Sequence, residues 1–285
     1  FPARPLRLVV LFPAGGPSDI VARLVSAKLG EVLGQNVVVE NRVGANGIVG
    51  TEHVVRAAAD GHTLVIASAS SLAMNHAVVA KLPYDTVRDL ACVSLVSTTP
   101  ELLAVHPSVP ARSVKELVAL ARAKPGQFVM ASTSSGSMPH LALELFKGAA
   151  RIDALHVPYN GAAPAVTATL GGQVHGLFAD LPVLQQHIAG GRLRGLGMAS
   201  PRRAPLLPDL PTMAEQGLPT VEAVNWSAIF APAKVPSEVM RRLQEALVQS
   251  LNDGPLRERL AGNGADPIPG TSQQGDRKST RLNSS

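Results

Sequence analysis

The chain has 285 residues, a formal net charge of +5 and a hydrophobic fraction of 46%. This length allows one large domain or two ordinary ones, each with a core of its own. The aromatic fraction is only 3% and the Lys and Arg residues are scattered, so no stacking platform or basic patch for nucleic acid is expected. The single cysteine, Cys92, excludes an internal disulfide and a cysteine-based metal cluster.

The sequence also lacks a stretch that is long and apolar enough to cross a bilayer, so we expect no membrane span. The chain begins FPARP without Met, which is typical of a processed or trimmed product whose signal peptide has been removed.

The first predicted unit is a strand, a glycine turn and a helix. The strand covers Leu6 to Phe12, and apolar residues then recur at three- and four-residue steps until Gly34 ends the helix. The turn between them reads PAGGPS. A glycine turn before a helix N-terminus favours an anion, because the first N–H groups lack partners and the helix dipole is positive there. The alternative is a plain tight turn in which Ser18 or Asp19 caps the helix.

The turn matches neither of two familiar phosphate-binding patterns. A Walker A loop needs Gly-Lys-Ser/Thr, and a dinucleotide fingerprint needs glycines spaced G-x-G-x-x-G. The chain then continues with the strand NVVVEN, the loop RVGANG, a helix from about Ile48 to Ala58, and the strand TLVIAS. Alternating strands and helices indicate a parallel sheet, so the serines after TLVIAS are expected at the same sheet edge as the first turn.

A second series of strands and helices begins near Glu101. Its elements are ELLAVHP as a strand, SVKELVALARA as a helix, QFVMAS as a strand, the loop STSSGSMPH, the helix LALELFKGAA, ALHVPY as a strand, a helix from about Ala162 to Leu170, and the strands VHGLFAD, GLGMAS and VNWSAIFAP. Two α/β units are the simplest interpretation.

The serine-rich loop STSSGSMPH raises the alternative of a hydrolase that uses Ser137. A nucleophile elbow needs G-x-S-x-G, and the second glycine is missing here. His140 is more simply a polar residue that lines the loop or sits in the first helical turn. Asp180 ends a predicted strand and is a candidate binding residue, with capping of the helix near Pro182 as the alternative.

The histidines and carboxylates show no metal-ligand spacing, so neither a metal nor a cofactor is expected. What remains is a set of loops that are rich in Gly, Ser, Thr and Asn and almost free of charge. Such loops would hold an anion with backbone N–H groups, hydroxyls, helix dipoles and water. We therefore predict a binding protein that is not an enzyme.

Six segments of the chain resemble one family in the expected order, from Phe1 to about Gly270. They are FPAGGPSDIVARLV, VVVENRVGANGIVGTE, AADGHTLVIAS, KLPYDTVRDL, HVPYNGAAPA and LPTMAEQGLP. These segments are similar to the Bug family of periplasmic solute-binding proteins, the receptors of tripartite tricarboxylate transporters.

The resemblance implies an α/β fold of the two-domain periplasmic binding protein type (type II-like), with two Rossmann-like lobes around a ligand cleft and two crossing hinge strands. We place the crossings near Ser97 to Glu101 and Glu222 to Trp226. Domain one then comprises residues 1–98 with 225–273, and domain two comprises residues 99–224. Residues 274–285, which lack apolar periodicity, are predicted to be a non-native or disordered tail.

The resemblance further implies a periplasmic receptor that captures a small organic carboxylate and delivers it to membrane transporter subunits of the tripartite tricarboxylate type. The ligand would be a di- or tricarboxylate, an acidic amino acid or an aromatic acid. The implied ligand-binding residues are Phe12, Ala14, Gly15, Gly16, Ser68, Ser70, Ser134, Ser135, Gly136, Ser137, His140, Tyr159, Asn160, Ala162 and Asp180.

Two of these positions bear on which acid fits. Many relatives have Lys where Asn160 stands, and Asp180 either receives the ammonium of an amino-acid ligand or only orders water and N–H groups. A ligand-sensing module for a signalling system is a further alternative to transport. Neither the ligand nor the oligomeric state follows from the sequence.

Overall fold

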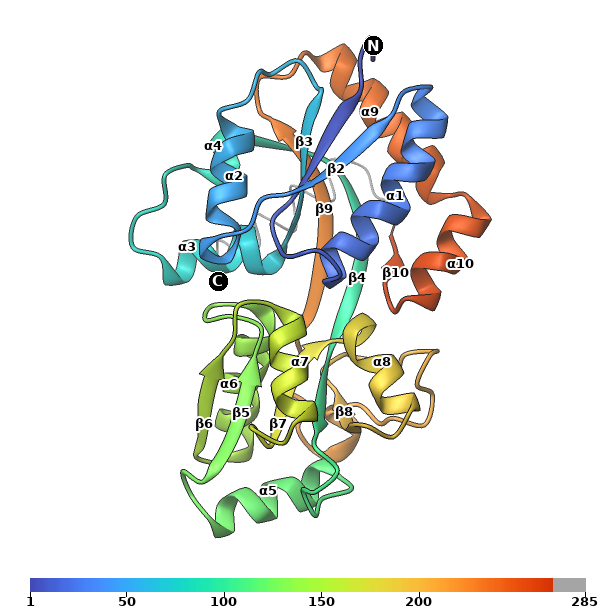
Figure 1. Ribbon diagram of the computed structural model, residues 1–285. Helices are drawn as coiled ribbons and strands as arrows, with labels where there is room; N and C mark the ends of the chain where they lie inside the picture. Colours follow the sequence, from blue (N-terminus) through green and yellow to red (C-terminus); the bar gives the residue numbers. More distant parts are fainter. Residues whose placement is uncertain (269–285) are drawn as a thin grey trace. The chain divides into compact units, whose positions relative to one another are not determined.

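The computed structural model describes residues 1–268, which form two compact units (Figure 1). Unit 1 consists of Phe1–Thr98 together with the chain from Trp226 onward, and unit 2 consists of Thr99–Asn225. The tail predicted from residue 274 lies outside the described residues.

Unit 1 is built on a mixed sheet in the order β2 (Val37–Asn41), β1 (Leu6–Val10), β3 (Thr63–Ser68) and β9 (Val224–Pro232). The first three strands are parallel, and β9 runs antiparallel to β3. Val10 lies opposite both Asn41 and Ile66 in the register. The carboxyl ends of β1, β2 and β3 therefore meet at one edge, which is where the predicted binding loops begin.

Helices cover this sheet and supply the core of unit 1 (Figure 1). They are α1 (Pro17–Leu33), α2 (Ile48–Val55), α3 (Asn75–Val78), α4 (Thr86–Asp89), α9 (Ser237–Leu251) and α10 (Gly254–Gly262), with a 3-10 turn at Ala45–Gly47 and a π-helical turn at Ser70–Met74. Helix α1 packs against α9 and α10, and Leu29 of α1 and Leu247 of α9 are fully buried in the same cluster as Leu8. The apolar stripe read in the sequence is thus the face that α1 buries.

Strand β4 (Leu90–Val105) runs from unit 1 into unit 2 and is longer than predicted. The strand was expected to begin near Glu101, whereas in the structure the eleven residues from Leu90 to Pro100 also belong to it. Pro100 interrupts the segment, and proline within a run normally argues against a strand, because it cannot donate to the ladder. The short strand β10 (Asp266–Pro267) pairs with β4 at Ser97 and Thr98.

Unit 2 has its own sheet, in the order β6 (Ala154–Pro158), β5 (Phe128–Ser132), β7 (Gly176–Asp180) and β4, with β8 (Arg194–Met198) also paired to β4. Strands β5, β6 and β7 are parallel, and β4 is antiparallel to β7 and β8. The helices are α5 (Val114–Ala123), α6 (Met138–Ala150), α7 (Ala162–Leu170) and α8 (Leu181–Ala189), with a 3-10 turn at Ala214–Gln216. The carboxyl ends of the parallel strands again share one edge, and α6, α7 and α8 begin there.

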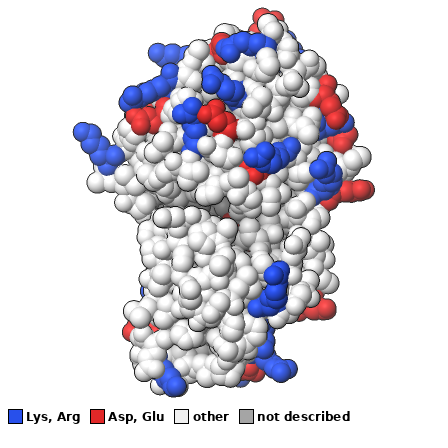
Figure 2. All heavy atoms as spheres, in the orientation of Figure 1, with Lys and Arg blue, Asp and Glu red and all other residues white. Residues whose placement is uncertain are grey.

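Charged side chains are interspersed on the surface. Figure 2 shows Lys and Arg next to Asp and Glu over the visible face of unit 1, with no continuous basic surface in this view. Several are ion pairs, such as Arg56 with Glu52 and Arg241 with Glu245. Among residues 1–268, no helix combines the length and the apolar character needed to span a bilayer.

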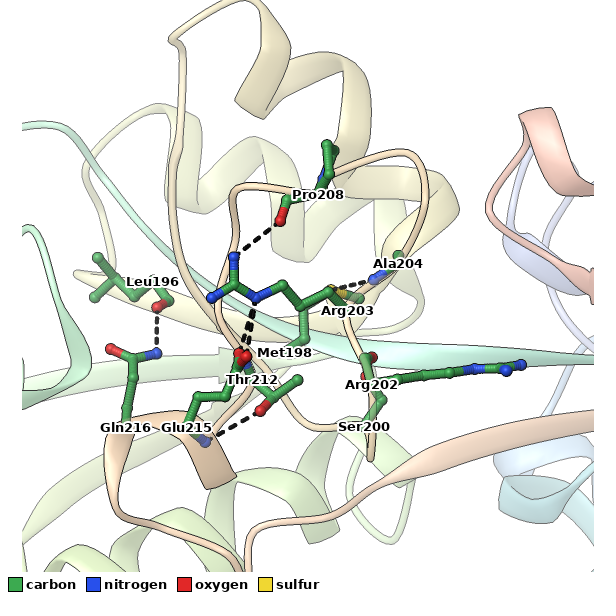
Figure 3. Close-up of polar contacts among 10 residues, drawn as sticks. All are labelled: Leu196, Met198, Ser200, Arg202, Arg203, Ala204, Pro208, Thr212, Glu215 and Gln216. Atoms are coloured by element: carbon green, nitrogen blue, oxygen red, sulfur yellow. Dashed lines mark hydrogen bonds and ion pairs between the residues drawn. The ribbon is translucent and has the colours of Figure 1, made fainter.

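The segment after β8 is held to unit 2 by side chains of the motif LPTMAEQG (Figure 3). Glu215 accepts hydrogen bonds from Nε of Arg203 and from the backbone N–H of Thr212, and its own N–H donates to Oγ1 of Thr212. Gln216 donates to the carbonyl of Leu196 at 2.8 Å, and its Oε1 accepts from the N–H of Val114 at 3.0 Å. The amide of Gln216 therefore joins the start of α5 to β8.

Replacing Gln216 with Ala is expected to lower the free energy of unfolding by about 2 kcal/mol, because Leu196 and Val114 are buried and each would keep an unpaired backbone group. Urea denaturation followed by circular dichroism measures the change. Gln127→Ala, at an exposed position in the same unit, serves as the control and is expected to change stability by less than about 0.5 kcal/mol. Equal midpoints for the two variants would contradict this role for Gln216.

Candidate ligand-binding site

The first predicted loop follows β1 and is held in place by Asp19 of α1. Oδ2 of Asp19 accepts the N–H of Gly15 at 3.0 Å and Nε of Arg23 at 2.8 Å. Asn41, at the end of β2, donates from Nδ2 to Oδ1 of Asp19 and to the carbonyl of Phe12, both at 3.0 Å. The loop is thereby fixed to the ends of two strands.

The electrostatics of Asp19 agree with this anchoring role. Its burial favours the neutral acid, but the hydrogen bonds from Arg23, Gly15 and Asn41 outweigh that effect and hold the pKa of Asp19 below its ordinary value. The carboxylate is therefore charged at neutral pH. The alternative that Asp19 caps α1 is wrong, because no side chain caps this helix at Gly16. The carboxylate of Asp19 instead accepts the N–H of Gly15 in the preceding loop.

Gly15 and Gly16 form a turn in which both backbone N–H groups already have hydrogen-bond acceptors within the chain. The N–H of Gly16 donates to the carbonyl of Pro13 at 3.3 Å, and the N–H of Gly15 is used by Asp19. Gly15 has φ +77°, a left-handed conformation that favours glycine. Ala14 and Gly15 are exposed, and the N-terminus of α1 carries no side-chain cap. The positive end of the α1 dipole is thus left for a ligand.

The second loop of unit 1 follows β3 and is tied to the loop RVGANG. Nδ2 of Asn46 donates to the carbonyl of Ser70 at 3.0 Å and to Oδ1 of Asn75 at 2.9 Å. Nδ2 of Asn75 donates back to the carbonyl of Asn46 and to that of Ser71. The side chain of Ser68 is buried, and its Oγ has no hydrogen-bond partner among the described residues. Ser68 and Ser70 thus lie on a rigid turn.

Three asparagines that hold these loops were missed by the sequence analysis. Asn41, Asn46 and Asn75 were not among the predicted residues: Asn41 ends β2, Asn46 lies in the 3-10 turn after it, and Asn75 begins α3. Asn46 has φ +50°, a left-handed conformation in which Asn is enriched among residues other than glycine. Polar side chains at strand ends were the available signal.

The serine loop of unit 2 follows β5 and ends at the start of α6. Ser137 is the N-cap, and its Oγ accepts from the N–H of His140 at 3.4 Å and donates to the carbonyl of Ser134 at 2.7 Å. The N–H of Gly136, a residue with φ +69°, donates to Nδ1 of His140 at 3.1 Å. The ring of His140 therefore supports the loop backbone and is not hydrogen-bonded to Ser137, which disfavours a Ser137 nucleophile.

A second histidine, His156 of β6, stacks on His140 with ring centroids 4.1 Å apart. Its Nε2 lies 2.7 Å from Oγ of Ser132, a hydroxyl that donates to the carbonyl of Ser134. Burial lowers the pKa of His140, while burial and the neighbouring His140 lower the pKa of His156 to about 4. Both rings are therefore neutral at neutral pH. Ser132 links His156 to the serine loop through its hydrogen bond to the carbonyl of Ser134.

The loop after β6 contains Tyr159, Asn160 and Ala162 and is joined to the serine loop. The N–H of Tyr159 donates to the carbonyl of Ser132 at 3.0 Å, and the N–H of Gly161 donates to the carbonyl of Thr133 at 2.8 Å. Helix α7 begins at Ala162, and no side chain caps its N-terminus at Gly161. A second uncapped helix terminus thus lies beside the hydroxyls of the serine loop.

Asp180 ends β7 and is 7% exposed. The alternative that it caps α8 is wrong, because its side chain makes no cap hydrogen bond. Instead Oδ1 of Asp180 accepts Nδ2 of Asn225 at 3.2 Å. Burial raises the pKa of Asp180 to about 6, and the Asn225 hydrogen bond opposes part of that shift. Asp180 shares the unit 2 edge with the serine loop and the α7 N-terminus.

The predicted residues therefore gather at one edge of each sheet. Phe12, Ala14, Gly15, Gly16, Ser68 and Ser70 lie at or after the ends of β1 and β3 in unit 1, and the nine residues predicted in domain two lie at or after the ends of β5, β6 and β7 in unit 2. Within residues 1–268, no group of three or more His, Cys, Asp or Glu residues could hold a metal ion. Neutral polar loops and uncapped helix N-termini at the sheet edges of both α/β units suit an anionic ligand.

Comparison with known proteins then gives the family. The model of the tripartite tricarboxylate transporter family receptor, TctC, matches residues 21–280. The chain belongs to this family, which confirms the resemblance to the Bug receptors. Because the family consists of receptors, the chain is a binding protein and not an enzyme.

One curated relative and two solved structures illustrate the similarity. The chain is 37% identical over 275 residues to protein BugT of Bordetella pertussis, covering 96% of this chain and 84% of that protein. The structure of Rpa4515 from R. palustris with adipate has a TM-score of 0.96 and 33% identity, covering 99% of this chain and 94% of that one. MatC from Rhodopseudomonas palustris with bound malate has a TM-score of 0.90 and 29% identity, covering 100% and 99%. These matches confirm the predicted periplasmic binding protein fold.

Proposed function

We propose that this protein is a periplasmic receptor that captures a small organic carboxylate and delivers it to the membrane subunits of a tripartite tricarboxylate-type transporter. The observation that carries the proposal is that α1 in unit 1 and α7 in unit 2 each begin at the loop edge of their sheet without a side-chain cap. Uncapped N-termini offer N–H groups and a positive dipole end to a carboxylate.

The neighbouring side chains suit the same ligand. Ser135 and Tyr159 add hydroxyls near the α6 and α7 termini, and the predicted loops contain neither Lys nor Arg. A carboxylate held in this way is bound by hydrogen bonds and water. The solved relatives that carry adipate and malate support a carboxylate ligand.

The proposed function is tested by calorimetry and thermal shift on protein freed of co-purified ligand by unfolding and refolding. The panel contains mono-, di- and tricarboxylates, amino acids and aromatic acids, with uncharged sugars as the control. We expect at least one acid to bind and to raise the melting temperature, because a ligand that binds only the folded state stabilises it. Binding of a sugar with no response to any acid would contradict the proposal.

Replacing Gly15 with Ala is expected to weaken binding of the acid found in this panel by at least about fivefold. A Cβ at φ +77° is strained although it meets no neighbour within 4 Å, so the loop is expected to relax and redirect the Ala14 and Gly16 backbones. Calorimetry gives the dissociation constant. Gly148→Ala, at an open position within α6, is the matched control and should keep wild-type affinity. Equal affinities for both variants would exclude Gly15 from the site.

A further inference from the structure

Glu101 of β4 lies directly opposite Asp180 of β7 in the antiparallel register of unit 2. Opposed residues in such a ladder project from the same face, with Cβ atoms about 5 Å apart. Glu101 is fully buried and Asp180 nearly so. Asn225 completes the group through its hydrogen bond to Asp180. We call Glu101, Asp180 and Asn225 the acid cluster.

The acid cluster has hydrogen-bond acceptors in excess. Oε1 and Oε2 of Glu101 and Oδ1 of Asn225 are all buried and lack a partner among the described residues. Asn225 donates one N–H to Asp180, and ionised carboxylates only accept. A group that satisfies these oxygens must therefore bring several donors, and a positive charge on it would offset the buried carboxylate.

The pKa values of Glu101 and Asp180 are both raised, which agrees with the scarcity of hydrogen-bond donors around them. Burial, with a smaller contribution from the neighbouring Asp180, raises the pKa of Glu101 well above its ordinary value, and burial raises the pKa of Asp180 to about 6. No Lys, Arg or His side chain is hydrogen-bonded or ion-paired to either acid within residues 1–268. Burial thus disfavours the charged form of both carboxyls, and a cation beside them would offset the charge of the Asp180 carboxylate.

The acid cluster lies at the edge of the unit 2 sheet from which the predicted ligand-binding loops begin. Asp180 ends β7 at the edge where the serine loop follows β5 and where α7 begins after β6. The same edge thus offers uncapped helix N–H groups for an anion and a carboxyl pair for a cation. Of the acid cluster, Glu101 is enclosed, whereas Asp180 and Asn225 keep some exposure and are the members that a ligand can reach.

We propose that the acid cluster receives the protonated amine of the ligand, so that the carboxylate captured by this receptor is an amino acid. The proposal rests on the proposed function and narrows its ligand class. Asp180 and Asn225 contact the ammonium, which has three donors, and Glu101 is a positioning residue that supplies the second carboxyl behind them. A diacid without an amine would meet the charge of Asp180 and lose affinity.

The test compares acids that differ only in the amine. The matched pairs are L-aspartate and succinate, L-glutamate and glutarate, L-2-aminoadipate and adipate, and L-phenylalanine and 3-phenylpropanoate, each titrated by calorimetry at pH 7.5 into ligand-free protein. We expect the tightest ligand to be an amino acid and to bind at least about tenfold more tightly than its partner, as one charge-assisted contact can supply.

Variants then connect the preference to the cluster. Asp180→Asn is expected to reduce the ratio of the two dissociation constants to about threefold or less, and Glu101→Gln to reduce it partly. Glu222→Gln removes an exposed acid from the same chain segment and should keep the wild-type ratio. If Asp180→Asn does not fold, the ratio of dissociation constants in wild type and in Glu101→Gln still tests the amine site. A purely structural role of Glu101 would change the stability of the protein and not its preference for an amine.

The outcomes separate the two proposals. If a diacid or monoacid binds as tightly as its amino partner, or if the ratio is unchanged in both cluster variants, the amine site is wrong while the carboxylate receptor stands. If water alone supplies the hydrogen-bond donors to the acid cluster, the diacid or monoacid is expected to bind as tightly as its amino partner. If none of these acids or those of the wider panel binds, the proposed function fails, and the amine site fails with it.

Discussion

Replacing Asp19 with Ala is expected to lower the free energy of unfolding by about 3 kcal/mol and to weaken ligand binding by at least about a hundredfold. The carboxylate of Asp19 receives the N–H of Gly15, Nε of Arg23 and Nδ2 of Asn41. Removing it leaves the N–H of Gly15 and one N–H of the Asn41 amide without their acceptor beside a residue that was buried, a loss that typically costs about 1–3 kcal/mol per group. The side chain of Arg23 is 54% exposed, so its lost ion pair adds little.

The effect on binding follows from geometry. Asp19 is the α1 side chain that hydrogen-bonds to the loop, through the N–H of Gly15, and Asn41 fixes the carbonyl of Phe12 while it is itself oriented by Asp19. Without Asp19 the loop must be ordered when the ligand binds, and that cost appears as lost affinity. Asp19→Asn keeps the shape and one acceptor oxygen, so it should fall between wild type and Asp19→Ala.

Urea denaturation and calorimetry with the acid identified for the wild type measure the two effects. Glu31→Ala is the control: it removes an exposed carboxylate from the same helix, where Glu31 forms a surface ion pair with Lys28. Wild-type affinity in a folded Asp19→Ala protein would mean that the first loop does not contact the ligand.

The architecture was largely predictable because local signals and tertiary packing agree in this chain. Strand β9 was predicted with the bounds found, and helix α1 ends at Gly34 in a left-handed conformation, as the glycine suggested. The prediction failed at β4, where the strand was expected to begin near Glu101 and instead begins at Leu90. There the pairing partners, far away in sequence, override the local preference.

The loops of the site were predictable in position, but not in their internal contacts. Asn41 reaches Asp19 across 22 residues, and Asn46 reaches Asn75 across 29. No local pattern specifies such pairs, since they depend on which strands become neighbours. Glu101 was missed for the same reason. A glutamate at the start of a predicted strand is expected to be exposed, and the pairing of β4 with β7 places it opposite Asp180. The roles of the predicted residues in ligand binding remain predictions.

Stability between about pH 4.5 and 6 is expected to reflect two opposing titrations within unit 2. Burial and His140 lower the pKa of His156 to about 4 from an ordinary value near 6.5. As the pH falls below 6.5, the unfolded chain gains a proton that the folded chain does not take up at His156. The free energy of unfolding therefore falls as the pH is lowered, by at most about 3 kcal/mol near pH 4.

Asp180 acts in the other direction. Its folded pKa of about 6 lies above the ordinary value of 3.8 because the carboxyl is buried. As the pH rises above 3.8, the unfolded chain loses a proton that Asp180 retains in the folded state until about pH 6. The free energy of unfolding therefore falls as the pH rises through this window, again by at most about 3 kcal/mol, and the raised pKa of Glu101 adds to the same trend.

Variants separate the two contributions. In ligand-free His156→Gln, the free energy of unfolding should increase by about 1–2 kcal/mol relative to wild type as the pH is lowered from 6 to 4.5. In Asp180→Asn it should decrease by a similar amount over the same interval, because the remaining histidine effect is no longer offset. Urea denaturation at three pH values across the window gives both slopes, and Asp209→Asn, an exposed acid in unit 2, controls for the loss of a charge.

The sign of each slope is the decisive observation, since the magnitudes depend on how far each buried group relaxes. Parallel slopes for wild type and His156→Gln would mean that His156 is protonated in the folded protein at these pH values, and the brace it forms with Ser132 would then have to use a different tautomer or partner. A slope for Asp180→Asn equal to that of wild type would mean that Asp180 is ionised throughout the window. In that case a positive group already neutralises the acid cluster in the ligand-free protein, and the cluster could not distinguish an amino acid from a diacid by its charge.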